Sequence, residues 1–398
     1  MKKNRRFLLP LLIVLLSFTM ACALLDQFLP TQAPQPTEAP IVPTDEPNQS
    51  LPEPTATEEP TPTTQPTEIP PNHGQILYIS EGNVWRYLVD EGTMTQLTFD
   101  GVTDSYDSTY INPLFSADGR FASYMRNGVS YLHNLEDNSV VSLPARIIRW
   151  SQSTPTAFYA ASGPFECPAV DNLENQTEIN FDLRRYDVAA LESPVFIANI
   201  TGGLFFPQTI SEDEQYASIL HCACYSECGS HVLHHLPSNS IMVSPPDLYP
   251  GSIDFSPDSS RLVTSPMQLY GYFESSLYLA NNDFTGAFPL YSAPNVAVVN
   301  PRWSPLGDWI AFTAYDIAGE MELDDKRAMI INLDGSVTLE IAAGNAEFNN
   351  WSPDASQILF RRGDWEAYTP FIYDLVSGMT TELPFTASWS EMDWGVLP

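Results

Sequence analysis

The chain has 398 residues, and its 17 Lys and Arg against 49 Asp and Glu give a formal net charge of −32. This balance argues against nucleic acid as a partner, because binding to phosphates needs clustered Lys and Arg. It favours solubility and the attraction of cations or basic partners.

The N-terminus has the pattern of an export signal. A basic start is followed by the apolar run Phe7–Phe18, which is too short to cross a bilayer comfortably. The run ends at Thr19–Cys22, which resembles the lipobox of bacterial lipoproteins, although Thr19 stands where Leu is usual. We predict that residues 1–22 are a lipoprotein signal peptide and that Cys22 carries a lipid anchor. An ordinary cleaved signal peptide is the alternative.

The next segment has the composition of a disordered spacer. The stretch Pro30–Pro71 contains no Lys, Arg or aromatic residue, and Pro recurs every few positions. Such a chain buries too little apolar surface to offset its ordering entropy, while Pro and like charges keep it extended. Residues 23–72 are therefore predicted to form a semi-rigid linker with a reach of about 100 Å. A Pro-rich ligand for a partner domain is a weaker alternative, because the repeats carry no basic anchor.

Residues 73–398 are predicted to form one all-β domain. Short runs rich in Val, Ile, Phe, Tyr and Trp alternate with segments of the turn-forming residues Gly, Asn, Asp and Pro. No stretch has a convincing helical pattern. No later stretch is long and apolar enough to span a membrane. One phrase recurs in this region: an aromatic residue, Ser-Pro, a small turn and an alternating apolar run. It appears as NPLFSADGRFASYM from Asn112, SIDFSPDSSRLVTS from Ser252, NPRWSPLGDWIAF from Asn300 and NNWSPDASQILFRR from Asn349.

The spacing of the phrase indicates a repeat. Most steps between its copies are in the forties, which is the period of a four-stranded propeller blade. Each copy is then the inner hairpin of a blade, with a large residue wedged between neighbouring blades and Asp and Ser capping the turn. The wedge positions are Phe115, Trp150, Ile210, Phe255, Trp303, Trp351 and Trp394.

The phrases RWSPLGDWIAF, DFSPDSSRLV and NWSPDASQILF resemble the TolB-type, WD-like repeat of bacterial β-propellers. The resemblance covers nearly the whole region from Gln75 to Pro398, and it implies the fold and a role in protein–protein contacts of the envelope. TolB itself is a soluble periplasmic protein, whereas this chain is expected to be anchored. Two copies depart from the pattern: the one from Ile147 lacks the turn Asp, and the one at TISEDEQYASIL has Ile210 in the aromatic position.

The two ends of the region predict how the ring closes. The segment from Gly74 to Phe99 supplies three strands without an inner strand, and Ser388–Pro398 carries Trp394 where an inner strand would have its aromatic residue. We predict that this last segment completes the first blade, which leaves no exposed central edge. The count is then seven four-stranded blades. Six blades is the alternative, if the copy from Ile147 is not a true blade.

Four cysteines follow Cys22, at Cys167, Cys222, Cys224 and Cys228. In an exported protein four cysteines usually make two disulfides, and Cys167 with Cys222 and Cys224 with Cys228 is the pairing we favour. The flanking histidines leave a zinc site as an alternative, although the C-x-C-x3-C spacing is not a familiar zinc pattern. Free or mixed thiols are a further alternative.

Catalytic motifs are absent from the sequence: it contains no G-x-S-x-G, H-E-x-x-H or Walker loop. The turn residues Asp118, Asp258 and Asp354 are interpreted as turn caps rather than calcium ligands. We therefore expect no cofactor, no metal ion and no catalytic residues.

Three classes of function remain open. The first is a non-catalytic binding module for a protein or glycan partner, tethered extracytoplasmically at the cell surface or in the periplasm and monomeric. The second is an enzyme of lyase or glycosidase type that uses paired carboxylates in the central funnel, for which a raised pKa would argue. The third is a structural component of an envelope complex.

The binding module is expected to use one face of the propeller. The loops from second to third strand and from fourth to first strand emerge on the same face, and here they combine aromatic residues with acids and two arginines. The alternative is that these side chains only cover the blade ends. The predicted contact residues are Tyr106, Tyr110, Tyr270, Tyr272, Asp316, Arg361, Arg362, Trp365 and Tyr368, accompanied by Asp104, Asp107, Asp364 and Glu366.

Overall fold

The computed structural model describes residues 73–103, 108–163, 180–201, 207–222, 228–242, 244–245, 248, 250–266, 274–317, 323–364, 367–388 and 392–398. The predicted signal peptide and linker, residues 1–72, lie outside this range. The described blades belong to one compact unit, Ile69–Pro398. No helix in the described range has the length and apolar character needed to cross a membrane.

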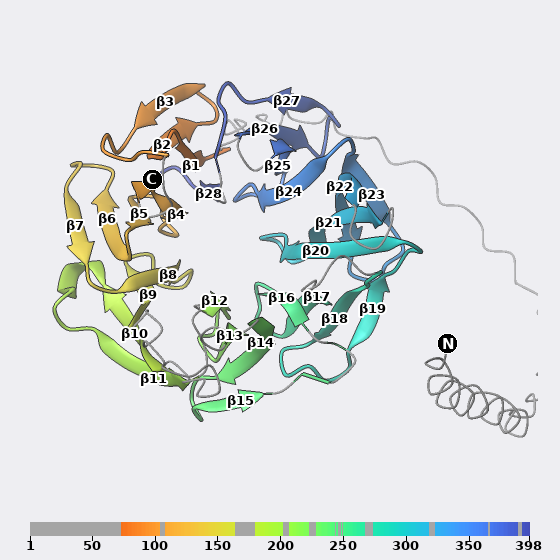
Figure 1. Ribbon diagram of the computed structural model, residues 1–398, viewed down its shortest axis with the longest axis horizontal. Helices are drawn as coiled ribbons and strands as arrows, with labels where there is room; N and C mark the ends of the chain where they lie inside the picture. The colour runs from red at the N-terminus through yellow and green to blue at the C-terminus, as the bar shows by residue number, and fades with distance from the viewer. Residues whose placement is uncertain are drawn as a thin grey trace, which may run out of the picture. The chain divides into compact units, whose positions relative to one another are not determined.

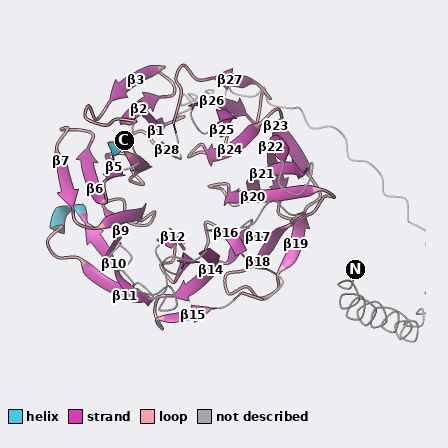
Figure 2. Ribbon diagram, in the orientation of Figure 1, coloured by secondary structure: helices cyan, strands magenta, loops and turns pink. Residues whose placement is uncertain are grey.

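The described chain is all-β and forms seven four-stranded antiparallel sheets arranged in a ring, a seven-bladed β-propeller (Figure 1). Figure 2 shows that strands account for nearly all of its regular structure; the 3-10 helix η3 (Val188–Ala190) is one short exception. From the innermost strand outward, the first four blades are β28 (Asp393–Gly395), β1 (Gln75–Ser80), β2 (Asn83–Leu88), β3 (Thr93–Gln96); β4 (Ile111–Phe115), β5 (Phe121–Arg126), β6 (Val129–Asn134), β7 (Val140–Leu143); β8 (Arg146–Trp150), β9 (Ala157–Ser162), β10 (Asn180–Asp187), β11 (Val195–Thr201); and β12 (Pro207–Ile210), β13 (Tyr216–Cys222), β14 (Cys228–His235), β15 (Ser240–Met242). The last three blades are β16 (Pro250–Phe255), β17 (Arg261–Pro266), β18 (Leu277–Asn281), β19 (Phe288–Tyr291); β20 (Val296–Trp303), β21 (Trp309–Ile317), β22 (Leu323–Asn332), β23 (Thr338–Ala342); and β24 (Ala346–Trp351), β25 (Gln357–Asp364), β26 (Ala367–Asp374), β27 (Thr380–Glu382).

The predicted closure of the ring is confirmed. Strand β28 pairs antiparallel with β1, with Trp394 opposite Ile76 and Gly395 opposite Gln75. The Trp394 indole nitrogen donates to the carbonyl of His73 at 2.5 Å, and the Gln75 side-chain amide donates to the Val396 carbonyl at 2.7 Å. The blade that begins at β8 is complete, so the seven-blade count is confirmed and six blades is wrong.

The repeated phrase does form the inner hairpin of the second to seventh blades, whereas the inner pair of the first blade joins the two ends of the domain. The seven wedge residues are buried, each at most 6% exposed. In the seventh blade the Ser352 hydroxyl donates to Asp354 at 2.6 Å and accepts from the Gln357 amide at 2.9 Å, while Asp354 also accepts from the Ser356 amide at 3.0 Å. Asp118 and Asp258 make the equivalent bonds, which confirms the turn-cap interpretation.

The core is divided among the blade interfaces. Within the described residues seven clusters of buried apolar side chains occur, one between each pair of neighbouring blades. The cluster at the closure joins the first and last blades, where the ring of Phe385 stacks on Tyr78 with centroids 3.8 Å apart. Each blade therefore depends on both neighbours for the burial of its faces, which is a reason for the ring to close.

The antiparallel topology gives the ring two different ends. Turns from first to second and from third to fourth strand lie at one end, which we call the short-turn face; the remaining connections lie at the other, which we call the loop face. The start of β1 and the end of β28 lie together at the short-turn face, where the Gln75 amide also donates to the carbonyl of Gly119 in the second blade's turn at 2.8 Å. The covalent link to the segment before His73 is therefore at the short-turn face.

Candidate functional site

The loop-face residues that the sequence singled out divide into two groups. Tyr110, Asp316, Arg361, Arg362 and Tyr368 are described. The remainder lie outside the described residues or have no described side chain: Asp104, Tyr106, Asp107, Tyr270, Tyr272, Asp364, Trp365 and Glu366.

The described aromatic residues of this group are buried rather than displayed. Tyr110 is 5% exposed and Tyr368 is 9% exposed. The Tyr110 hydroxyl donates to Asp100 at 2.8 Å, and the guanidinium of Arg126 lies over its ring at 5.0 Å. The rings of these two tyrosines are already covered by Arg126 and Arg361, respectively. They therefore stabilise the ends of their blades.

The described charged residues meet at the loop-face ends of the sixth and seventh blades. Glu347, at the start of the inner strand β24, accepts from Arg361 Nη2 at 2.9 Å and pairs with Lys326. The guanidinium of Arg361 also lies over the Tyr368 ring at 4.0 Å. We call Lys326, Glu347, Arg361 and Tyr368 the Glu347 cluster. The sequence analysis missed Lys326 and Glu347, because they come from strands of different blades.

The electrostatics of the Glu347 cluster hold it in one charge state at neutral pH. Burial alone would raise the pKa of Glu347, but the hydrogen bonds and charges of Lys326 and Arg361 outweigh burial and lower that pKa. A carboxylate held between two cations offers no proton for catalysis near neutral pH. The cluster is therefore a fixed and largely buried ion-pair network, in which only Lys326 and Arg361 are partly exposed, and it is ill suited to proton transfer.

Arg362 and Asp316 are anchored in a similar way beside this cluster. Arg362 donates to the Ala343 carbonyl at 2.9 Å, and its guanidinium lies 5.2 Å from the centroid of Phe371. Asp316 pairs with Arg327, while its own side chain stays 46% exposed. The contacts of Arg362 and Asp316 fix the orientation of both side chains, and the Asp316 carboxylate remains partly exposed to solvent.

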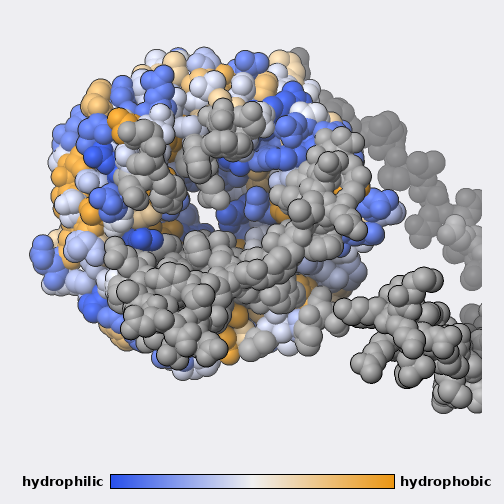
Figure 3. Space-filling model, in the orientation of Figure 1, coloured by the Kyte–Doolittle hydropathy of each residue, from blue (hydrophilic) through white to orange (hydrophobic). Residues whose placement is uncertain are grey.

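Near the axis of the ring, the residue just before a wedge residue connects neighbouring inner strands. The Asp254 carboxylate accepts from the Trp303 amide at 2.9 Å, and the Asp393 carboxylate accepts from the Phe115 amide at 2.6 Å. Arg149 donates to the Ile210 carbonyl at 3.0 Å. Figure 3 shows the ring hollowed at its centre, with hydrophilic residues around the part of the hollow that the picture leaves uncovered.

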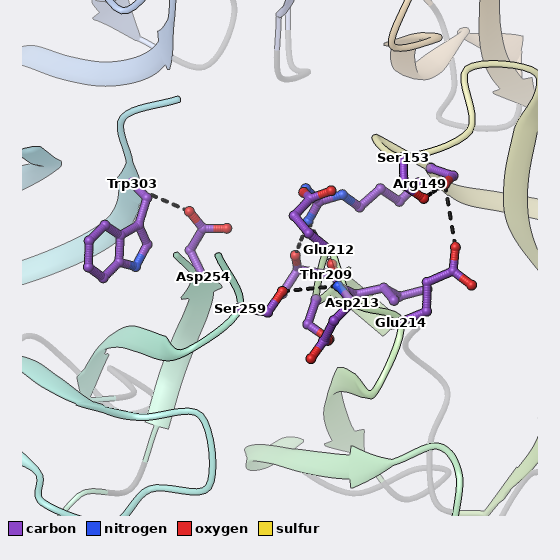
Figure 4. Close-up of polar contacts among 12 residues, drawn as sticks. Arg149, Ser153, Thr209, Glu212, Asp213, Glu214, Asp254, Ser259 and Trp303 are labelled. Atoms are coloured by element: carbon purple, nitrogen blue, oxygen red, sulfur yellow. Dashed lines mark hydrogen bonds and ion pairs between the residues drawn. The ribbon is translucent and has the colours of Figure 1, made fainter. Parts of the chain in front are cut away.

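The fourth blade places an acidic turn beside this ring of contacts (Figure 4). Its turn reads Ser-Glu-Asp-Glu, so Glu212 stands where the later copies have Pro, and Glu214 adds a further acid. Glu212 pairs with Arg149 of the third blade at 2.5 Å. Glu214 accepts from the Ser151 hydroxyl at 3.5 Å, while Asp213 caps its own turn by accepting from Ser211 at 2.6 Å.

The pKa of the Glu212 carboxyl group lies above the ordinary value for a glutamate. Burial raises it, the negative charges of Asp254, Asp213 and Glu214 add to the rise, and the charge of Arg149 opposes it. Sequence analysis read this segment only as a blurred copy of the repeat. Three consecutive acids, where the turns of the other copies have at most one, are the signal that would have found it.

The cysteine predictions are left open by the structure. Cys167 and Cys224 lie outside the described residues, and Cys222 and Cys228 are register partners of β13 and β14, whose side chains are not described. The disulfide pairing stays a prediction. Among described residues, no group of three or more His, Cys, Asp or Glu is arranged to hold a metal ion.

Comparisons with known proteins show the fold. No protein-family model and no curated protein matches the chain. Solved structures that match include a prolyl endopeptidase (TM-score 0.56, 10% identity, covering 81% of this chain and 49% of that one) and prolyl oligopeptidase B from Galerina marginata (0.51, 12%, 79% and 51%). TolB from Acinetobacter baumannii also matches (0.49, 11%, 83% and 68%). The chain spans about half the length of the two peptidases. At these identities the likeness shows the propeller fold alone.

Proposed function

We propose that this chain is a membrane-tethered extracytoplasmic β-propeller, and that it acts as a non-catalytic binding module for a protein or glycan partner in the cell envelope. Residues 1–22 supply the export signal with the lipid on Cys22, residues 23–72 supply the linker, and residues 73–398 supply a monomeric propeller without a cofactor. The resemblance of the repeat phrases to TolB-type propellers supports an envelope role. The acidic net charge argues against nucleic acid.

The observation that carries the proposal is the Glu347 cluster at the loop face. It combines a carboxylate, two cations and an aromatic ring near the inner strands, with Arg362 and Asp316 alongside. Arg side chains are enriched in binding hot spots, and the partly exposed Lys326, Arg361 and Arg362 are already ordered, so they lose little entropy when a partner binds. The loop face lies at the opposite end of the ring from His73, where the described chain begins.

The test compares capture of partners by the two faces. Cells producing a tagged chain are treated with a chemical crosslinker, and the captured species are quantified for the wild type and for Trp365→Ala, Tyr272→Ala and Arg362→Ala, singly and together. The proposal expects these variants to lose captured species. Matched short-turn changes, Val376→Ala and Leu306→Ala, remove exposed side chains and should leave capture unchanged. Equal loss from both sets would contradict the proposal.

A second candidate function, a carboxylate-based lyase or glycosidase, is favoured by Glu212. This carboxyl has a raised pKa and lies near the Asp254 carboxylate, the combination expected of an acid–base pair. Against it, both carboxylates are engaged, Glu212 by Arg149 and Asp254 by the Trp303 amide. The test incubates the wild type, Glu212→Gln and Asp254→Asn with a panel of acidic and neutral oligosaccharides and measures reducing ends and unsaturated products. Product release that both substitutions abolish would support the enzyme, and no release by the wild type would contradict it.

A further inference from the structure

The connection from β3 to β4, which joins the first blade to the second, displays Phe99 on the loop face, where 78% of the side chain is exposed. In three blades a leucine at the end of the outer strand packs into the core: Leu97, Leu143 and Leu383. The residue two positions after this leucine is buried in the other two blades, Ala145 at 2% and Phe385 at 8% exposed. Phe99 therefore departs from the repeat, because its ring is turned to solvent where the equivalent side chains are packed.

The first blade holds this loop in place from one side. Single exposed apolar residues are common on protein surfaces, so the exposure of Phe99 alone would carry no argument. The Asn83 side-chain amide, however, donates to the carbonyls of Glu81 and Gly101, each at 3.1 Å, and its oxygen accepts from the Gly101 amide at 2.9 Å. A Cβ atom added at Gly101 would collide with the Gly82 carbonyl. The Phe99 loop is therefore packed directly on the turn at Glu81 and Gly82.

The second blade holds the loop from the other side, through the residue that follows Phe99. The Asp100 carboxylate accepts from the Tyr110 hydroxyl at 2.8 Å and pairs with Arg126 at 2.7 Å, and Arg126 also donates to the Asp100 carbonyl at 2.9 Å. A side chain on an ordered loop loses little entropy when a partner covers it. Aromatic side chains are enriched at the centres of protein interfaces. The fold thus presents Phe99 in an orientation that is fixed before any partner binds.

The chemistry around Phe99 suits an apolar partner surface. Val102, on the same loop, is 47% exposed. The hydrogen-bonding groups of Asp100 and Asn83 are already engaged within the chain. A sugar needs several polar groups around it to fix its orientation, whereas an apolar pocket of a protein needs only an apolar side chain that fits it. The loop therefore favours a protein over a glycan.

Negative charge borders this apolar surface. Glu81, in the turn on which the loop packs, is exposed, and the Asp100 side chain stays 67% exposed although it pairs with Arg126. Arg146 belongs to the third blade and approaches the second blade at Gly128, whereas Glu81 belongs to the first. The border next to the first blade is therefore acidic, and the net charge of −32 disfavours an acidic partner. A complementary surface carries cations around its apolar centre.

We propose that Phe99 inserts into an apolar pocket of a partner protein, and that Lys or Arg side chains on the rim of this pocket face Glu81 and Asp100. Val102 packs against the edge of the same pocket. The proposal rests on the binding function proposed for the loop face, and it adds to that function the class of partner and an anchor residue. The first blade adjoins the seventh through their shared core cluster, so the Phe99 loop and the Glu347 cluster belong to the same part of the ring.

The first experiment measures whether Phe99 enters an apolar pocket with a cationic rim. The probe is amino-β-cyclodextrin, a host with an apolar cavity and ammonium groups on its rim, and neutral β-cyclodextrin is compared with it. Fluorine NMR of the full chain follows a fluorinated phenylalanine placed at Phe99 or, as the matched control, at Phe196, which is 54% exposed and the register partner of Arg184. Both hosts should give saturable shifts at Phe99, and the aminated host should bind there about threefold more tightly.

The charge of Glu81 should account for part of this preference. Glu81→Gln should weaken binding of the aminated host at Phe99 and leave binding of the neutral host unchanged, while Phe196 should show no preference between the hosts. The absence of a saturable shift at Phe99 would overturn the anchor. An equal preference at Phe196 would show general attraction to the negative chain and would overturn the role of the acidic border.

The second experiment identifies the class of partner in intact cells that export the protein. A benzophenone amino acid at Val102 should give a discrete crosslinked species that protease digests and glycosidases leave intact. Phe99→Ala should reduce this species several-fold, and Phe196→Ala should not. A species that resists protease and is cleaved by glycosidases would show a glycan and would overturn the protein pocket.

The outcomes separate this proposal from the function on which it rests. A Val102 species that Arg362→Ala reduces but Phe99→Ala leaves unchanged would overturn the anchor and leave the loop-face function standing. A species that Phe99→Ala reduces but Arg362→Ala does not would support the anchor and contradict the role of the Glu347 cluster. No discrete species from Val102, Tyr272 or Trp365 would overturn both.

Discussion

At the scale of single residues, contacts between sequence neighbours are easier to predict from the sequence than contacts between residues far apart in the chain. The cap of Asp354 on its own turn involves neighbours within two residues, so the Ser-Pro-Asp phrase predicted it. Glu347 contacts Lys326, 21 residues away in the neighbouring blade, and Arg361, 14 residues away in the next strand of its own blade. No periodicity in the sequence marks such a pair, and Arg361 was predicted as a contact residue without its carboxylate partner.

The substitution Glu347→Gln tests the charge state of the Glu347 cluster. Because the folded-state pKa of Glu347 is lowered, its stabilising effect is fully present above the unfolded-state pKa of about 4.3 and is lost as the pH falls through the lower folded-state value. At pH 7 the variant should lose about 3 kcal/mol of unfolding free energy, since two partly buried cations lose their partner. The difference should shrink below pH ~4.

Urea unfolding of wild type and variant at both pH values measures this difference. Glu340→Gln is the matched control, because Glu340 is half exposed and approaches Arg327 only at 4.0 Å, so its removal should change stability by less than about 1 kcal/mol. A Glu347→Gln effect that is independent of pH would show that the carboxylate charge is not what stabilises the cluster.

At the scale of elements, the repeat predicted the strands and the closure, but not the departures from it. Most of the wedge residues are aromatic and precede a Ser-led turn, and this local signal located the hairpins. The fourth blade kept its fold with Ile210 as its wedge, because burial needs a large apolar residue rather than a specific ring. Its acidic turn was passed over, since the partners Arg149 and Tyr159 belong to the blade before it.

The closing strand β28 should be indispensable although it has only three residues. Trp394→Ala should cost about 3–5 kcal/mol, since the indole fills the cluster between the first and last blades. Deletion of Ser388–Pro398 should lower the melting temperature further and expose apolar surface at β1. Thermal unfolding of both variants, with Trp394→Phe as the milder control, measures the effect. A deleted chain that melts at the wild-type temperature would contradict the closure.

A second prediction on this strand concerns close packing. A Cβ atom added at Gly395 would lie 2.7 Å from the Phe115 ring, closer than non-bonded carbon atoms approach. Gly395→Ala should therefore push β28 away from the second blade and lower the melting temperature. In a double-mutant cycle with Phe115→Ala, which removes the ring atoms of this contact, the two substitutions together should lower the melting temperature by less than the sum of the single ones; no destabilisation by Gly395→Ala alone would refute the contact.

At the scale of the whole molecule, the topology separates two surfaces that the sequence could not place. Antiparallel blades put the start of β1, the end of β28 and all turns of the repeated phrase at the short-turn face. The loops with the predicted contact residues then lie at the opposite end. Sequence analysis predicted which loops share a face, because that follows from strand order. It did not predict which of their tyrosines would be buried, because burial depends on the neighbouring strands.

Anchoring belongs to this scale as well. If Cys22 carries the lipid, Cys22→Ser should move the protein from the membrane fraction to the soluble fraction and remove the mass of the acyl chains. Fractionation and intact-mass measurement of the mature chain provide the readout. A Cys22→Ser protein that stays membrane-bound with unchanged mobility would contradict the lipoprotein assignment.

The measurement that tests the central claim most directly is photocrosslinking in the cells that export the protein. A benzophenone amino acid is placed singly at Tyr272 and Trp365, which strand order predicts for the loop face, and at Leu306 and Val376 on the short-turn face. If the loop face binds the envelope partner, both loop-face positions give the same discrete crosslinked species, and Arg362→Ala reduces it. Discrete species from the short-turn positions, together with none from either loop-face position, would contradict the account.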